Sequence, residues 1–195
     1  MSDKLVPRED GATPLTGEER EGLKLSYITN RAELNAAEQA NILQAEAWAF
    51  KRKNNVLNRD FLNDLHQRMF GNVWKWAGKY RTTGKSIGVD AYRIRTDLQQ
   101  LIDDGTYWIE HGSYEPDEIA ARFHHRLVYL HPYSNGNGRH SRLAADLLLK
   151  LMDRPRFTWG SESLNDPGGT RQAYIDALRE ADSHDYGPLI EFVRS

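Results

Sequence analysis

The stretch LHPYSNGNGRHSR, residues 130–142, sets two glycines and two asparagines between a His-Pro pair and two arginines. Glycine and asparagine are poor residues for a helix interior. Yet apolar residues recur at helical spacing on both sides, over 119–130 and again over 143–151. The sequence therefore predicts a loop of special composition between two central helices.

The residue types in this loop suit a phosphate ligand. Gly136 and Gly138 let the backbone approach a ligand closely, and the N–H groups of such a turn and of the next helix attract anions. Arg139 and Arg142 are three residues apart, so their guanidinium forks share a helical face. His131 can accept a proton near neutral pH. Each feature alone is common in turns and helix ends; together they predict a polyphosphate cradle with a general base. The glycine spacing is not that of a P-loop.

Working outward, apolar periodicity and capping signals predict a mainly helical bundle. A short turn starts at Thr16, with Glu19 at capping-box spacing. Glycine-rich, β-prone residues at 74–95 predict a hairpin that pairs Tyr80–Thr83 with Ala91–Ile94. The predicted fold class is all-α with one small β-hairpin flap. The expected helices cover residues 30–53, 59–71, 96–112, 116–132, 170–181 and 188–193, and one more follows the Gly-Asn stretch and carries Leu143, Leu147, Leu148 and Leu151.

Composition narrows the classes of function. The 195 residues hold 26 Lys and Arg, 28 Asp and Glu and no cysteine, for a net charge of -2. A thiolate zinc site is excluded, and a nucleic-acid partner is disfavoured by the near-neutral charge. The longest apolar stretch is too short to span a bilayer, so we expect a cytoplasmic chain without a membrane partner. Nucleic-acid binding stays an alternative only because of local basic residues: Lys51, Arg52, Lys53, Lys75, Lys79, Arg81 and Lys85.

Residues 131–142 resemble the signature of the Fic/Doc family, His-Pro-Phe-x-Asp/Glu-Gly-Asn-Gly-Arg-x-x-Arg. The segments WAGKYR at 76–81 and RQAYIDALREADSHDYGPLIEF at 171–192 resemble other parts of that family. The resemblance divides the chain into a mobile N-terminal arm, 1–24, and a Fic-like domain, 25–195. More narrowly, NGNGRH resembles the Fic subgroup known as mobile mystery protein B.

The resemblance implies a protein adenylyltransferase, which transfers AMP from ATP to a Ser, Thr or Tyr hydroxyl of a target protein. His131 would be the base, and a flap at about Lys85–Ile94 would align the target by strand addition. Tyr174 would contact adenine, with an ordinary buried tyrosine as the alternative. Toxin-like bacterial effectors share this pattern, and an antitoxin is a further candidate partner. The phosphates would be held by Gly136, Asn137, Gly138, Arg139 and Arg142.

Three positions depart from the family pattern, and the mildest is Tyr133 in place of Phe, another ring whose hydroxyl needs a partner. Asn135 stands where the family has the Asp or Glu that holds Mg²⁺ or Mn²⁺, and an amide oxygen brings no charge to the metal. Thr29 and Glu33 resemble the family's inhibitory Ser/Thr-x-x-x-Glu, but Leu34 follows where Gly or Asn is expected. The alternative for Glu33 is an acidic residue favoured at a helix start.

Three other readings stay open. ATP bound in reverse would give Doc-like transfer of the γ-phosphate. Asn135 leaves open a weakly active or non-catalytic nucleotide-binding module. His124, His131 and His140 raise the idea of a zinc site. The adjacent His124 and His125 point about 100° apart, which favours packing or capping roles for them.

Overall fold

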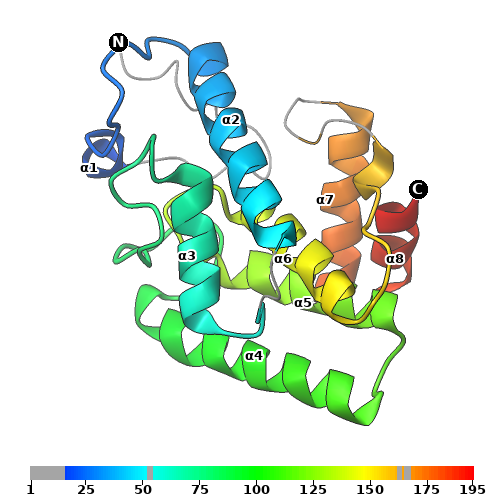
Figure 1. Cartoon of the computed structure of the whole chain (residues 1–195). Coiled ribbons are helices and arrows are strands. Elements are labelled where there is room, and N and C mark those ends of the chain that lie inside the picture. Colours follow the sequence, from blue (N-terminus) through cyan, green and yellow to red (C-terminus); the bar gives the residue numbers. More distant parts are fainter. Residues whose placement is uncertain (1–15, 52–54, 162–163, 165–167) are drawn as a thin grey trace.

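The computed structural model describes residues 16–51, 55–161, 164 and 168–195; the first part of the expected arm, residues 1–15, lies outside it. The described residues form helices joined by loops (Figure 1). In chain order these are α1 (Gly17–Arg20), α2 (Arg31–Phe50), α3 (Arg59–Phe70), the 3₁₀ turn η1 (Ala91–Arg93), α4 (Ile94–His111), α5 (Pro116–Leu130), α6 (Asn137–Leu151), the 3₁₀ turn η2 (Trp159–Ser161), α7 (Gly169–Asp182) and α8 (Gly187–Arg194).

Local signals in the sequence set most helix ends. The side chains of Asn30 and Asn58 accept the backbone N–H groups of Glu33 and Phe61, which caps α2 and α3. Pro116 occupies the first turn of α5, where its missing N–H costs nothing. The all-α class is therefore confirmed, and α7 and α8 begin and end within one residue of the expected bounds.

Helices α5 and α6 form the centre of the bundle (Figure 1). One apolar core lies on the side of α2, α3 and α4, and Phe123 and Leu148 are fully buried in it. A second, smaller core lies on the side of α7 and α8, and Ala121 and Leu149 are fully buried there. Because both cores hold α5 and α6, the loop between these two helices is fixed from both sides.

The expected hairpin is wrong for the described residues. Ala91–Arg93 is a 3₁₀ turn, and α4 starts at Ile94, two residues before the expected Thr96 cap. We call residues 82–90 the linking segment; no strand forms in it. The physical reason is the Arg81 side chain, which takes the carbonyl groups of Thr83 and Val89 that a hairpin would pair across strands.

Residues 16–24, expected as the end of the arm, are anchored to the domain. Leu23 and Trp74 form an antiparallel bridge, and the Trp76 indole donates to the Glu19 carbonyl at 3.0 Å. The Glu19 carboxylate pairs with Lys85 of the linking segment. Thr16 and Glu19 form the expected capping box. Within the described residues, no helix is long and apolar enough to cross a membrane.

Candidate functional site

A buried aromatic residue anchors the loop between α5 and α6. Tyr133 is fully buried, and its hydroxyl donates to the Asn63 amide oxygen at 2.9 Å. Its ring stacks on His66 with centroids 3.7 Å apart. His66 in turn bonds the Asn135 carbonyl through Nε2 at 3.0 Å, while its Nδ1 accepts from the Gly78 N–H at 2.9 Å. His66 belongs to no recognisable motif in the sequence, yet it ties the loop to α3 and to the turn after it.

The turn itself requires the residues found there. Gly136 has φ 79°, and a Cβ on it would lie 2.6 Å from the Phe70 ring. Only glycine fits both constraints. Asn137 is buried and clasps the loop: its oxygen accepts from the Tyr133 N–H at 2.9 Å and its amide donates to the Tyr133 carbonyl at 2.8 Å. The Asn137 side chain thus shapes the turn, and its backbone N–H belongs to the first turn of α6. Gly138 follows in that turn.

His131 ends α5 in a left-handed conformation, with φ 50° and ψ 58°. Its Nδ1 lies 3.2 Å from the Val128 carbonyl, which makes Nδ1 the protonated nitrogen and Nε2 the basic one. Burial above all, opposed by the hydrogen bond to the Val128 carbonyl and aided by the charges of Arg81 and Lys85, lowers the pKa of His131 to about 4. The imidazole is therefore neutral at pH 7 and able to accept a proton.

Arg139 lies on the α2 side of the site. Its guanidinium pairs with Glu38 at 2.6 Å and lies over the Phe70 ring, 4.8 Å from the centroid. The second Glu38 oxygen accepts from the Trp74 indole at 2.6 Å. Glu38, a buried acid on α2 that the sequence did not single out, therefore holds the first arginine of the motif.

Arg142 lies on the α7 side and is half-buried. Burial lowers the pKa of Arg142, and a hydrogen bond to Tyr174 raises it. The Tyr174 hydroxyl lies 2.9 Å from His124 Nε2. Burial lowers the pKa of His124 to about 3, so its ring is neutral and can accept from the tyrosine. Arg142, Tyr174 and His124 therefore form a chain of hydrogen bonds that holds the guanidinium in place.

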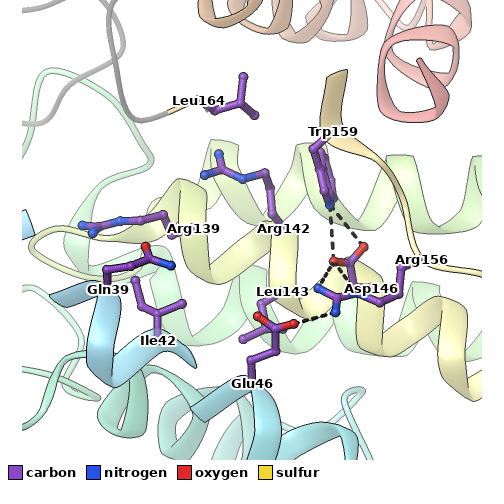
Figure 2. A pocket seen from close by; sticks show the side chains of 10 residues that line it. All are labelled: Gln39, Ile42, Glu46, Arg139, Arg142, Leu143, Asp146, Arg156, Trp159 and Leu164. Carbon is purple, nitrogen blue, oxygen red and sulfur yellow. Dashed lines mark hydrogen bonds and ion pairs between the residues drawn. The ribbon is translucent and has the colours of Figure 1, made fainter. Parts of the chain in front are cut away.

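A cavity of about 250 Å³ opens beside the two arginines. Figure 2 shows Arg139 and Arg142 on one side of it and the ion pairs of Arg156 with Glu46 and Asp146 on another. Burial raises the pKa of Asp146 in spite of Arg156. Tyr174 is not among the lining residues, which are Gln39, Ile42, Glu46, Arg139, Arg142, Leu143, Asp146, Arg156, Trp159 and Leu164.

The expected inhibitory role of Glu33 meets a different geometry. Glu33 is exposed, and its carboxylate accepts from the Thr29 N–H at 2.7 Å and from its hydroxyl at 3.1 Å. These bonds lower the pKa of Glu33 and tie it to its own helix start rather than to an arginine. The acid that does hold a motif arginine is Glu38, five residues along α2.

A protein-only metal site does not fit the donors present. In the part of the chain that the structure describes, no three His, Asp or Glu side chains gather in a way that could hold an ion. His124, His131 and His140 have separate partners, and Asn135 offers a neutral oxygen alone.

The chain is similar to known proteins over most of its length. Residues 56–149 match the model of the Fic/DOC family. The protein adenylyltransferase Fic of Nematostella vectensis is 28% identical over 146 residues, which cover 73% of this chain and 33% of that protein. The protein of the same name from Drosophila grimshawi is 30% identical over 146 residues, covering 73% of this chain and 29% of that protein. The chain thus spans about a third of the length of these curated relatives.

Solved structures extend the likeness beyond the matched core. A point variant of Fic-1 from C. elegans superposes with a TM-score of 0.64 at 25% identity, covering 89% of this chain and 51% of that one. The N-terminal Fic domain of a Bep effector from Bartonella quintana, solved with bound ADP, gives 0.70 at 16% identity, covering 90% of this chain and 94% of that one. At that identity it shows the shared fold. Motif, fold and relatives agree: the chain contains a Fic/Doc family domain.

Proposed function

We propose that this chain is a protein adenylyltransferase, which transfers AMP from ATP to a hydroxyl of a target protein. The observation that carries the proposal is the placement of His131 at one end of the 131–136 loop and of Arg139 and Arg142 on the first turns of α6. The two arginines line a cavity. Transfer of a nucleotidyl group to a hydroxyl needs a neutral base for the hydroxyl proton and positive groups for the phosphates. His131, the N-terminus of α6 and the two guanidinium groups supply them. The relatives named as adenylyltransferases support it.

Each residue of the site has a role in the transfer. His131 Nε2 takes the proton of the target hydroxyl, and the hydroxyl oxygen bonds to the α-phosphorus of ATP. The bond between that phosphorus and the bridging oxygen to the β-phosphate breaks, and pyrophosphate leaves. Arg142, Arg139 and the N–H groups of α6 offset the charge of the phosphates. If Mg²⁺ or Mn²⁺ takes part, the phosphates supply most of its ligands and Asn135 adds one oxygen.

Glu38 supplies a regulatory element of the same proposal. Its carboxylate competes with phosphate for Arg139, so the pair must open when a triphosphate binds. We assign the inhibitory role to Glu38 and not to Glu33. Membership of the subgroup known as mobile mystery protein B, a toxin-like role, an antitoxin partner, a cytoplasmic location and an adenine contact at Tyr174 remain parts of this proposal that rest on the sequence resemblance.

The proposal is tested with ATP labelled on either phosphate and a lysate as the source of target. Label from the α-phosphate on protein supports AMP transfer, and label from the γ-phosphate alone would indicate Doc-like phosphotransfer instead. His131→Ala should lower the rate of transfer about 10²- to 10⁴-fold and leave the affinity for nucleotide unchanged. His111→Ala, at the exposed end of α4, is the matched control. Nucleotide binding without any label would favour the non-catalytic module that Asn135 suggests.

A further inference from the structure

Arg81 is a nearly buried cation whose bonds all reach backbone carbonyls. Only 4% of the residue is exposed. Its Nε donates to the His131 carbonyl at 2.6 Å, and Nη1 donates to the Thr83 carbonyl at 2.9 Å. Its Nη2 donates to the carbonyl of Val89 and, at 3.4 Å, to that of Leu130. One side chain therefore joins two separate pieces of chain, the end of α5 with His131 and the linking segment 82–90.

The partners of Arg81 differ from those of an ordinary buried arginine. Within the described residues it bonds no carboxylate, although burial lowers its pKa and only the more distant charges of Asp90 and Glu19 raise it. A buried charge normally needs an opposite charge or several hydrogen bonds. The planar guanidinium fork instead fixes carbonyl groups at set angles. The partners of Arg81 indicate that its guanidinium holds the backbone in place and does not serve to neutralise a carboxylate.

The linking segment also touches the base directly. Gly88 has φ 104°, and a Cβ on it would lie 2.6 Å from the His131 Cβ and 2.8 Å from Arg81 Nη2. The backbone N–H of Arg81 donates to the Pro132 carbonyl at 2.9 Å, so both residues that follow the helix end are held. His131 itself is in the left-handed region, which a residue with a side chain adopts only when its surroundings impose it.

We propose that Arg81 is the positioning residue that fixes the linking segment against His131, so that a target hydroxyl presented along this segment meets the imidazole at a set distance. The inference rests on the proposed transfer function and adds to it the residue that joins target placement to the base. Arg81 contacts no reacting atom; it acts through the two backbones that it holds. A misplacement of 1 Å between reacting groups can cost about 10²-fold in rate.

The test uses the full chain with two substitutions of Arg81. Arg81→Ala removes both the fork and the charge, while Arg81→Lys keeps the charge and loses the fork. Both should lower transfer to protein about 10- to 100-fold and leave the affinity for an ATP analogue within about twofold. Arg68→Ala, in an exposed ion pair with Asp64, is the control and should change neither quantity. Wild-type transfer in both Arg81 variants would overturn the proposal, and so would a parallel loss of nucleotide affinity.

A second readout does not depend on transfer. The groups that face His131 are the Arg81 and Lys85 cations and the Val128 carbonyl. NMR titration of the imidazole should therefore show a raised His131 pKa in Arg81→Ala and a nearly unchanged pKa in Arg81→Lys. Amides of residues 82–90 should exchange faster in both variants. If the wild type labels no protein, these measurements still decide the positioning role: unchanged exchange and an unchanged His131 pKa in Arg81→Ala would overturn it.

Gly88→Ala covers the case in which the Arg81 variants fold poorly. It removes no hydrogen-bond donor, but its methyl group forces the linking segment away from His131. We expect transfer to fall and nucleotide affinity to hold. Transfer equal to the wild type in a folded Gly88→Ala protein would contradict a requirement for this close contact.

Discussion

Neutralising Glu38 should raise the affinity of the site for triphosphate. Glu38 is 5% exposed, and its carboxylate has two partners, the Arg139 guanidinium and the Trp74 indole, each at 2.6 Å. Glu38→Gln keeps an oxygen for the indole and turns an N–H group toward Arg139. Arg139 loses its anion and becomes available to phosphate.

The contacts set the size of the effect. A hydrogen bond to a charged group contributes about 1.5–3 kcal/mol net. Because phosphate no longer has to displace the carboxylate, the gain in affinity is about 10- to 100-fold. The same substitution removes a largely buried ion pair, so we expect the free energy of unfolding without nucleotide to fall by about 1–3 kcal/mol. Higher affinity together with lower stability is the signature of a competing internal ligand.

The assay is titration calorimetry with a non-hydrolysable ATP analogue and with AMP. Glu46→Gln is the matched control, because Glu46 also lies on α2 and lines the cavity but pairs with Arg156. It removes the same charge without freeing Arg139, and it should gain much less than Glu38→Gln. Glu33→Gln should gain nothing. Equal gains for Glu38→Gln and Glu46→Gln would refute release of Arg139, leaving only a general charge effect.

Three further predictions follow from the site. Arg142→Ala should weaken triphosphate binding more than AMP binding, measured by the same calorimetry, since the proposed contact is with the outer phosphates; equal losses would contradict it. Asn135→Asp should raise transfer with Mg²⁺ and weaken nucleotide binding with a chelator, because the added charge attracts the metal but repels phosphate; lower transfer with Mg²⁺ would mean that the asparagine serves another purpose. The urea midpoint of unfolding should decrease as the pH is lowered from 6.5 to about 4, because buried neutral histidines bind fewer protons than they do in the unfolded chain. Each such histidine should lower the free energy of unfolding by up to about 1.4 kcal/mol per pH unit. A flat profile would contradict the burial of these rings: His66, His124, His131 and His140.

The local parts of the fold were predictable from sequence, because their causes are local. Asn30 caps α2 as expected, and Pro116 opens α5, since caps and fixed φ angles act within one turn. The 131–142 loop was predictable for the same reason: its glycines and arginines lie within a single turn and the start of one helix. Apolar periodicity gave the helix faces, and both cores follow from them.

The partners across the chain were not predictable, because no local pattern encodes them. Glu38 meets Arg139 across 101 residues, and His66 meets the Asn135 carbonyl across 69. Glu33 bonds the N–H and hydroxyl groups of Thr29 at its own helix start, which is the alternative that its first-turn position also predicts. On α2, Glu38 is the acid on the buried face that meets α6.

Arg81 shows why composition misled the reading of residues 80–94. β-prone residues form a hairpin when cross-strand hydrogen bonds are the best available use of their carbonyl groups. Here a single guanidinium supplies donors to four carbonyls, so the segment is held without a partner strand. Arg81 is also one of the local basic residues that would favour a nucleic-acid partner. Its burial removes it from any such surface. A cation enclosed at the end of α5 has more effect on the histidine beside it than on a distant polyanion, and this is why the structure assigns Arg81 to the site.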